Sequence, residues 1–347
     1  ISQLKRGSKI NGIRYIFHTK NGNPQLLINV DKFCSVKLSR LIIRDKNNQI
    51  SSIANLSNDL SSIKTLDEFN PPLKKAQPFK GIKVAIVDTG VNYNLDFISR
   101  NISRKDSLTL TGYDFEDNDN LPYDMDLGRS AFFPMHHGTS VSSIILREAP
   151  MSELVVYRFP RSDMCKFDEL IRHIALNKIK IVNLSMGSSN KNDWGCFYEA
   201  ASEYKDILFF VSAGNDGNTG LTPPATAKNS IAVANHHNRG GSAPDTIAQS
   251  SSKGPTDDGR IKPDLAAPGS WVRSCLSQDA QDTGGNSWKS TWYIEYSGTS
   301  MAAPNAAGAS ALVHEYLTEI AGRPSPQGSL VKALLVLGAE DMGSRDI

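Results

Sequence analysis

The sequence contains no apolar run close to the ~20 residues that a membrane-spanning helix needs, so we expect no membrane span. Cysteine is scarce, and no two cysteines form a Cys-x-x-Cys pair, which argues against a structural zinc site. Basic residues are not interleaved with aromatic ones, so we expect no nucleic-acid partner. The sequence leaves open the disulfide status of its four cysteines, which are Cys34, Cys165, Cys196 and Cys275. With 347 residues, 39% of them hydrophobic, the chain is large enough for one main core and a small appendage.

The net charge of +2 conceals an uneven distribution. Residues 1–80 hold 14 Lys and Arg against 5 Asp and Glu, a net +9, and the remainder holds 24 against 31, a net −7. A Pro-rich run at 70–75 reads as a linker. We therefore expect an N-terminal extension at 1–75 and a main domain at 76–347, and opposite charge favours intramolecular contact between them. The extension is either a prosegment-like module or an ordinary appendage, and the sequence does not decide between these.

Three short motifs carry residues suited to nucleophilic catalysis. Asp88 follows an apolar run and opens Asp-Thr-Gly, His137 begins His-Gly-Thr, and Ser300 lies in Gly-Thr-Ser-Met-Ala-Ala-Pro. A serine hydroxyl needs a neighbouring base to take its proton, and the base needs an anion that fixes its tautomer. Asp-Thr-Gly alone also occurs in aspartic peptidases, and His-Gly-Thr alone is too short to be specific. Their conjunction with the longer serine motif predicts a catalytic triad.

A fourth motif supplies an oxyanion donor. The apolar run 207–211 leads into Ser-Ala-Gly-Asn-Asp-Gly, a tight turn with the amide of Asn215 at its tip. An amide at such a turn can donate a hydrogen bond to the charge that develops on a carbonyl oxygen. The main-chain N–H of Ser300 is the expected second donor.

Apolar runs and amphipathic stretches alternate through the main domain. We expect strands near 84–87, 154–158, 180–184, 207–212 and 230–234, and helices near 138–146, 167–177 and 195–205. Such alternation predicts an α/β fold with a mainly parallel, doubly wound sheet in three layers. A helix from 299 to about 317 would cross its core. In the N-terminal extension, short strands are expected at 13–17, 26–30 and 38–43.

From about Phe79 onward, these motifs together resemble the subtilisin-like serine peptidases, the subtilase family. Segments 223–229 and 251–269 are most similar to bacterial alkaline subtilases that often carry a C-terminal β-sandwich. The resemblance implies a subtilisin-like fold and a serine endopeptidase that works through an acyl-enzyme, with no cofactor for catalysis. It also implies a substrate-binding strand and a facing pocket wall, formed by Ser185, Met186, Gly187, Ala213 and Gly214. Met186 and the small facing wall suggest room for a medium or large apolar side chain.

The sequence departs from the family pattern around the catalytic histidine. Members usually have glycine before that histidine and a second histidine where this chain has Ser140, whereas here His136 precedes His137. We assign the catalytic role to His137, because it keeps register with the Gly-Thr that starts a helix. His136 is then expected at the rim of the site.

The loop 114–126 is rich in carboxylates, which calcium favours as ligands. Subtilases commonly bind structural calcium, so the candidate ligands are Asp117, Asp119 and Asp124. EF-hand spacing fails at Leu121, and a solvated acidic loop is the other interpretation. The expected partner is a peptide or protein substrate. The expected location is extracellular or in the cell envelope, although the sequence shows no signal peptide and leaves an intracellular location open. Two alternatives stand beside a general endopeptidase: a maturation peptidase with one protein target, and a pseudopeptidase that binds peptides without cutting them.

Overall fold

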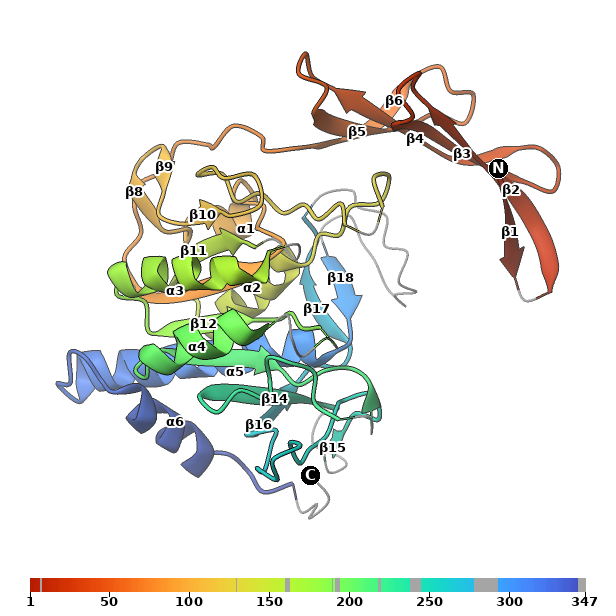
Figure 1. Ribbon diagram of the computed structural model, residues 1–347. Coiled ribbons are helices and arrows are strands. Elements are labelled where there is room, and N and C mark those ends of the chain that lie inside the picture. Colours follow the sequence, from red (N-terminus) through yellow and green to blue (C-terminus); the bar gives the residue numbers. More distant parts are fainter. Residues whose placement is uncertain are drawn as a thin grey trace. The chain divides into compact units, whose positions relative to one another are not determined.

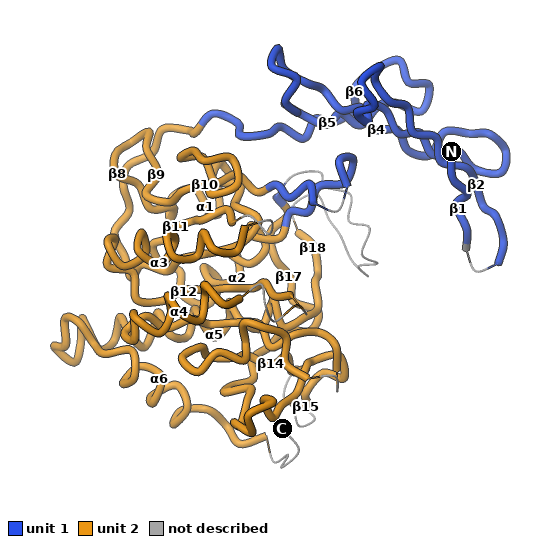
Figure 2. The backbone as a smooth tube through the Cα atoms, in the orientation of Figure 1, with its two compact units in different colours: residues 1–72, 125–136, 277–285 blue, residues 73–124, 137–276, 286–347 orange. Residues whose placement is uncertain are grey.

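The computed structural model describes residues 1–342 except 7, 129, 160–162, 189, 191–193, 218–219, 238–244 and 278–292. The chain divides into two compact units, coloured separately in Figure 2. Unit 1 contains residues 1–72, 125–136 and 277–285, and unit 2 contains residues 73–124, 137–276 and 286–347. The first division at 72/73 lies near the predicted boundary at 75/76. The assignment of 125–136 to unit 1 was not foreseen, because its packing partners lie far away in the sequence.

Unit 1 is built on a six-stranded antiparallel sheet in which each strand pairs with the next (Figure 1). The strands are β1 (Ser2–Arg6), β2 (Lys9–His18), β3 (Pro24–Asp31), β4 (Val36–Arg44), β5 (Ile50–Leu56) and β6 (Ile63–Glu68). The predicted strands at 13–17, 26–30 and 38–43 fall within β2, β3 and β4. On one face, Leu27, Ile42 and Ile53 pack against Phe132 from the segment 125–136.

A buried ion pair joins two strands of this sheet. Arg40 on β4 and Asp67 on β6 are 1% and 0% exposed, and the guanidinium donates to the carboxylate across the intervening strand β5. The Arg40 guanidinium also lies over the ring of Phe133, at 5.4 Å from its centroid. The small core of unit 1 is therefore completed by aromatic residues of 125–136.

Unit 2 contains an eight-stranded, mainly parallel sheet in the order β10-β11-β7-β12-β13-β14-β15, with β16 also paired to β14. Among the strand pairs of this sheet that the structure describes, β14 and β15 are antiparallel and the others are parallel. Its strands are β7 (Ile82–Asp88), β10 (Tyr113–Asp114), β11 (Ser152–Arg158), β12 (Ile181–Leu184), β13 (Leu208–Ser212), β14 (Ser230–His237), β15 (Thr246–Ile247) and β16 (Leu265–Pro268). Two separate hairpins pair β8 (Arg104–Asp106) with β9 (Thr109–Leu110) and β17 (Val272–Cys275) with β18 (Tyr293–Tyr296).

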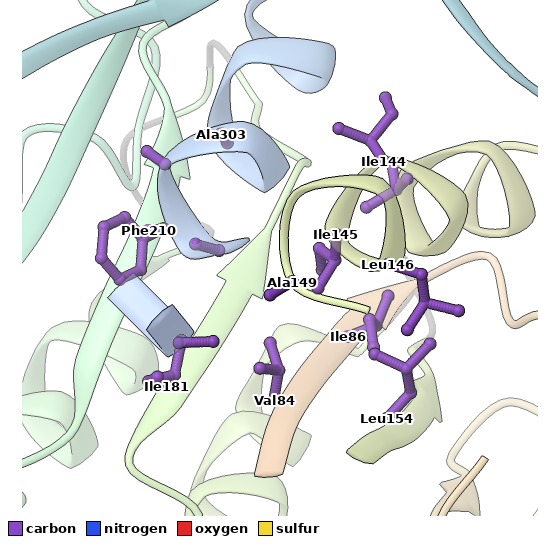
Figure 3. Packing of buried hydrophobic residues seen from close by; sticks show 14 of the residues in the cluster. Val84, Ile86, Ile144, Ile145, Leu146, Ala149, Leu154, Ile181, Phe210 and Ala303 are labelled. Carbon is purple, nitrogen blue, oxygen red and sulfur yellow. The ribbon is translucent and has the colours of Figure 1, made fainter. Parts of the chain in front are cut away.

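Helices cover both faces of this sheet. They are α1 (Asp96–Ser99), α2 (Gly138–Glu148), α3 (Phe167–Leu176), α4 (Gly195–Glu203), α5 (Thr299–Glu315) and α6 (Gly328–Leu337), with a 3-10 turn η1 (Met164–Lys166) and a π turn η4 (Tyr316–Ile320). Alternate residues of β7 enter opposite cores. Val84 and Ile86 pack with α2 and α5, as Figure 3 shows, and Ala85 and Val87 pack with α3 and α4. The predicted three-layer α/β fold is confirmed.

The structure shows which of the four cysteines form a disulfide. Cys165 of η1 and Cys196 of α4 form a disulfide, while Cys34 is a free, exposed thiol and Cys275 a free, buried one. The disulfide joins η1 and α4, the helical elements that follow β11 and β12, and these two strands lie on either side of β7. Among the helices of the described residues, none is long and apolar enough to cross a membrane.

Candidate active site

Asp88 and His137 form the central pair of the site. Asp88 is the last residue of β7 and is 2% exposed, so its carboxylate emerges at the carboxyl end of a buried parallel strand. The Nδ1 atom of His137 lies 2.9 and 3.0 Å from the two carboxylate oxygens of Asp88. This contact leaves Nε2 as the nitrogen that can exchange a proton with another group. Of the two neighbouring histidines, His137 is therefore the one held by Asp88, whereas His136 is buried in unit 1.

Close main-chain packing places His137 at the start of α2. A Cβ atom on Gly138 would lie 2.0 Å from the carbonyl oxygen of Gly90, so a side chain at 138 would separate the helix from the turn after β7. Gly90 has a φ of 95°, which glycine adopts without strain. The glycines of the two motifs therefore let the turn after β7 approach the start of the helix.

Ser300 is the second residue of α5. The hydroxyl of Ser300 donates to the carbonyl oxygen of Ser185 at 3.2 Å, and the hydroxyl of Ser185 donates to the carbonyl oxygen of Ser300 at 2.9 Å. Helix α5 shares one core cluster with α2, and Figure 3 shows Ala303 of α5 on the same side of the sheet as Ile144 and Ile145 of α2. The fold thus brings the helices that begin beside His137 and Ser300 into one layer.

Asn215 follows β13 and lies against the turn before Ser300. Its Oδ1 atom accepts hydrogen bonds from the N–H of Thr299 at 2.9 Å and from the Thr299 hydroxyl at 3.1 Å. A Cβ atom on Gly298 would lie 3.4 Å from its Nδ2 atom. With Oδ1 bound to Thr299, the NH₂ group is the part of this exposed side chain that can donate to a ligand.

The predicted substrate-binding residues lie on both sides of this turn. Gly214 donates its N–H to Thr299 Oγ1 at 3.2 Å, and Ala213 is fully buried beside it. Gly187 is exposed, whereas Met186 is 8% exposed and packs in the core with α3 and α4. Met186 therefore contributes main chain to this region, and its side chain does not enlarge a pocket there.

The predicted calcium ligands have other partners. Asp117 pairs with Arg158, and Asp124 accepts from the Thr89 hydroxyl at 2.6 Å and from the Thr139 N–H at 2.9 Å. Asp114, the other partner of Arg158, has its pKa raised to about 6 by burial, against the effect of that guanidinium. Within the described ranges, no group of three or more His, Cys, Asp or Glu could hold a metal ion. Structural calcium therefore stays a prediction.

Sequence reasoning did not identify the positioning role of Asp124 and Thr89. Thr89 Oγ1 accepts from the main-chain N–H groups of His137 at 3.1 Å and Gly138 at 2.9 Å, while donating to Asp124. The threonine of Asp-Thr-Gly was visible as a motif residue. The contact of Thr89 with Asp124 could not be predicted, because Asp124 lies 35 residues away in an acidic loop where it was considered as a calcium ligand.

Comparison with known proteins gives a consistent result. The sequence model described as the Subtilase family matches residues 79–346. Thermitase of Thermoactinomyces vulgaris is 28% identical over 250 residues, which cover 67% of this chain and 75% of thermitase. The serine protease/ABC transporter B family protein tagD of Dictyostelium discoideum is 39% identical over 107 residues, 27% of this chain but only 6% of tagD. The crystal structure of a lanthipeptide protease superposes with a TM-score of 0.60 at 21% identity, covering 76% of this chain and 81% of that one.

Proposed function

Because the chain belongs to the subtilase family, we propose that it is a serine endopeptidase in which Asp88, His137 and Ser300 form the catalytic triad. The observation that carries the proposal is the buried carboxylate of Asp88, 2.9 Å from His137 Nδ1. A carboxylate at that nitrogen fixes the tautomer in which Nε2 can take a proton, and it stabilises the imidazolium that results.

In the proposed reaction, the Ser300 hydroxyl attacks the carbonyl carbon of the scissile peptide bond while His137 takes its proton. The oxyanion accepts hydrogen bonds from the Asn215 amide and the Ser300 N–H. His137 then gives the proton to the leaving amine, which breaks the peptide bond and leaves an acyl group on Ser300. A water molecule, deprotonated by His137, hydrolyses that ester and restores the serine.

The resting contact of Ser300 fits this sequence of events. Its hydroxyl donates to Ser185, a residue of the predicted substrate-binding strand. A substrate that pairs with this segment would compete for the same main-chain carbonyl. We therefore expect substrate binding to release the hydroxyl toward His137, since catalytic hydrogen bonds often tighten only in the substrate complex.

The test is covalent labelling by a fluorophosphonate, followed by intact-mass measurement. We expect one adduct on the native chain and none on Ser300→Ala, with His137→Ala labelled far more slowly. A native chain that folds but takes no adduct contradicts the proposal and supports the peptide-binding pseudopeptidase. A matched Ser310→Ala variant, altered at a buried serine further along α5, should label like the native chain.

A dedicated maturation peptidase remains the alternative. The lanthipeptide protease is similar to this chain in fold, but at 21% identity that likeness supports the fold alone. Digestion of a proteome-derived peptide library decides between the two, because a general endopeptidase cleaves many sequences and a dedicated one very few.

We also propose an extracellular or cell-envelope location. The Cys165–Cys196 disulfide supports it, since disulfides persist mainly in oxidising compartments. Mass spectrometry of the native protein without reductant should find this pair oxidised, and finding both thiols free contradicts the proposed location.

A further inference from the structure

The antiparallel sheet of unit 1, whose strands are labelled β1 to β6 in Figure 1, has two chemically different faces. Residues directly opposite each other in the ladder point to the same face, and successive residues of one strand point to opposite faces. One face holds the buried Arg40–Asp67 ion pair and packs against Phe132 of the segment 125–136. The strand register therefore also identifies the residues of the other face.

We call this second face the uncharged face, because its ladder positions in β2 to β5 and the middle of β6 carry no charged side chain. It consists of Ile13, Tyr15 and Phe17 of β2, Leu26, Ile28 and Val30 of β3, Ser39, Leu41 and Ile43 of β4, Ser52 and Ala54 of β5, and Leu66 of β6. Lys64 and Glu68 lie on either side of Leu66 on the edge strand β6. The charges nearest to the uncharged face are thus at its margin.

The uncharged face lacks the cover that the opposite face has. None of its side chains belongs to a core cluster formed by the described residues. Phe17 is 50% exposed and Leu66 43% exposed, whereas Leu27 and Ile53 on the opposite face are buried. Soluble proteins rarely leave a contiguous apolar patch larger than a few hundred Å² uncovered, and such patches mark interaction surfaces.

The positive charge of unit 1 lies away from this face. Residues 1–80 have a net charge of +9, but Lys20, Lys32 and Lys46 lie in the turns between strands. Arg14 bonds Asn29 on the opposite face. Burying a charged side chain without a partner is costly, so the surface that covers the uncharged face must itself be apolar and uncharged. A second copy of the same face meets this condition.

The size of the side chains changes across the face. Tyr15 and Phe17 on β2 are bulky, whereas Ser52 and Ala54 on β5 are small. Two sheets that pack face to face usually keep their strands nearly aligned. A two-fold axis that runs along the strands would place β2 of each copy over β5 of the other. The large side chains of one copy then lie over the small ones of its partner.

We propose that the uncharged face binds the same face of a second copy of this chain, with β2 over β5 and β3 over β4. Five strands about 4.8 Å apart, with about five residues of 3.4 Å each, span a plane of roughly 400 Å² per copy. Because side chains expose more area than this plane, the pair buries on the order of 1,000 Å², the size at which specific interfaces begin. The inference is independent of the proposed peptidase activity.

The first test is sedimentation equilibrium of the full chain as Ser300→Ala, which prevents self-digestion. The average mass should rise with concentration toward twice that of one chain. Added NaCl should leave the dimer intact or tighten it, because the interface is apolar and salt screens the repulsion between the lysine-bearing turns. A chain that stays monomeric up to about 100 µM, beyond the micromolar range of weak specific interfaces, overturns the inference. Dissociation by NaCl also overturns it, because that indicates attraction between basic and acidic surfaces.

A charge introduced at the centre of the face should break the dimer. Ile28→Asp should raise the dimer dissociation constant by at least about 100-fold, because each copy would bury an unpaired carboxylate. Ile16→Asp is the matched control, since Ile16 is opposite Leu27 on the other face and is 37% exposed, so its dissociation constant should equal the native one. If hydrogen exchange shows that Ile28→Asp does not fold, the half-exposed Phe17 serves as Phe17→Asp. A dimer that persists in a folded variant of the uncharged face overturns the inference.

A mixture of two variants tests the relative placement of the strands. In the proposed packing, Ile28 of each copy lies near Leu41 of the other. Ile28→Asp and Leu41→Lys should each be monomeric alone. Mixed together, they should associate at least about tenfold more tightly than either alone, because the introduced carboxylate and ammonium groups can pair across the interface. A mixture that stays monomeric, although both variants are folded, overturns the packing of β3 over β4.

Discussion

Thr89 uses one hydroxyl group for three contacts, which explains why this residue stands in the Asp-Thr-Gly motif. It donates to Asp124 and accepts from the N–H groups of His137 and Gly138. Asp88 accepts the Thr89 N–H at 2.8 Å. At the residue scale, the geometry of the Asp88–His137 pair is therefore fixed by polar groups on three separate segments.

Replacing Asp88 by Asn should lower kcat by about 10⁴-fold, because an amide at this position favours the wrong tautomer of His137. The change preserves volume, so the thermal unfolding midpoint should stay close to that of the native chain. Stopped assays with a fluorogenic peptide substrate measure kcat. A loss of less than tenfold would show that another group orients the histidine.

Replacing Asp124 by Asn should lower kcat by about 10- to 100-fold with little change in KM, the rate equivalent of the roughly 1.5–3 kcal/mol that a hydrogen bond to a charged group contributes. Asp124 touches Thr89 and Thr139 rather than substrate, so it is a positioning residue. Glu116→Gln changes an exposed carboxylate of the same loop and should leave kcat unaltered. A change confined to KM would contradict the positioning role.

At the scale of elements, local pattern was sufficient for the strands of unit 2 that it identified. The apolar run 84–87 became β7, and the predicted helix at 195–205 became α4, which ends at Glu203. Local sequence pattern could not predict features that depend on contacts between distant segments. One example is Thr222, whose side chain lies close to both Gly187 and Gly214, although no local period relates these three segments. The Cys165–Cys196 pairing, 31 residues apart, is another.

A buried ion pair in the segment before β16 links β14 to α6. Lys262 is 3% exposed and donates to the Ser230 carbonyl and the Asp264 carboxylate, which also binds Lys332. Burial lowers the pKa of Lys262, so its charge depends on these partners. Lys262→Met should lower the free energy of unfolding by about 3–5 kcal/mol, because it leaves Asp264 buried with one fewer partner.

Lys332→Met is the matched control, since this lysine contacts the same carboxylate but is 35% exposed. Lys332→Met should lower the free energy of unfolding by less than about 1 kcal/mol. Urea unfolding in the Ser300→Ala background, which prevents self-digestion, measures both variants. If both variants lower the free energy of unfolding equally, the burial of Lys262 does not strengthen its interaction with Asp264.

The disulfide is expected to stabilise unit 2. Cys196→Ser should lower the free energy of unfolding by about 2–4 kcal/mol, the usual range for a native bridge. Reductant should destabilise the native chain by the same amount and leave the variant unaffected. Cys34→Ser changes an exposed free thiol, so its free energy of unfolding should equal that of the native chain. If reductant also destabilises Cys196→Ser, the loss of stability has a cause other than this disulfide.

At the scale of the whole molecule, the two units are not two consecutive stretches of chain. The segment 125–136 belongs to unit 1, and the next residue is His137 of unit 2. Cleavage in the linker near Lys75 would therefore leave 125–136, with Phe132, attached to the other fragment. The attraction expected between basic residues 1–75 and the acidic remainder is a separate prediction, and a salt-dependent association of the two fragments would test it.

Phe132→Ala should destabilise unit 1 by about 3–5 kcal/mol, because the ring is 3% exposed against Leu27, Ile42 and Ile53. Hydrogen exchange should lose protection at the amides of β3 to β5 and keep it at β7. Phe33→Ala removes a ring that is 75% exposed and should change stability by no more than about 0.5 kcal/mol. Uniform loss of protection across both units would contradict a separate core.

Because unit 1 is built from separate stretches of the chain, its parts are synthesised at different times. All six strands of its sheet precede Phe69, but Phe132 is synthesised 63 residues after that position. At about 5–20 residues per second, the nascent sheet leaves the ribosome several seconds before the aromatic residues that complete its core. During that interval the apolar face of the sheet is uncovered, so a chaperone acting on the nascent chain would meet it before the segment leading to His137 exists.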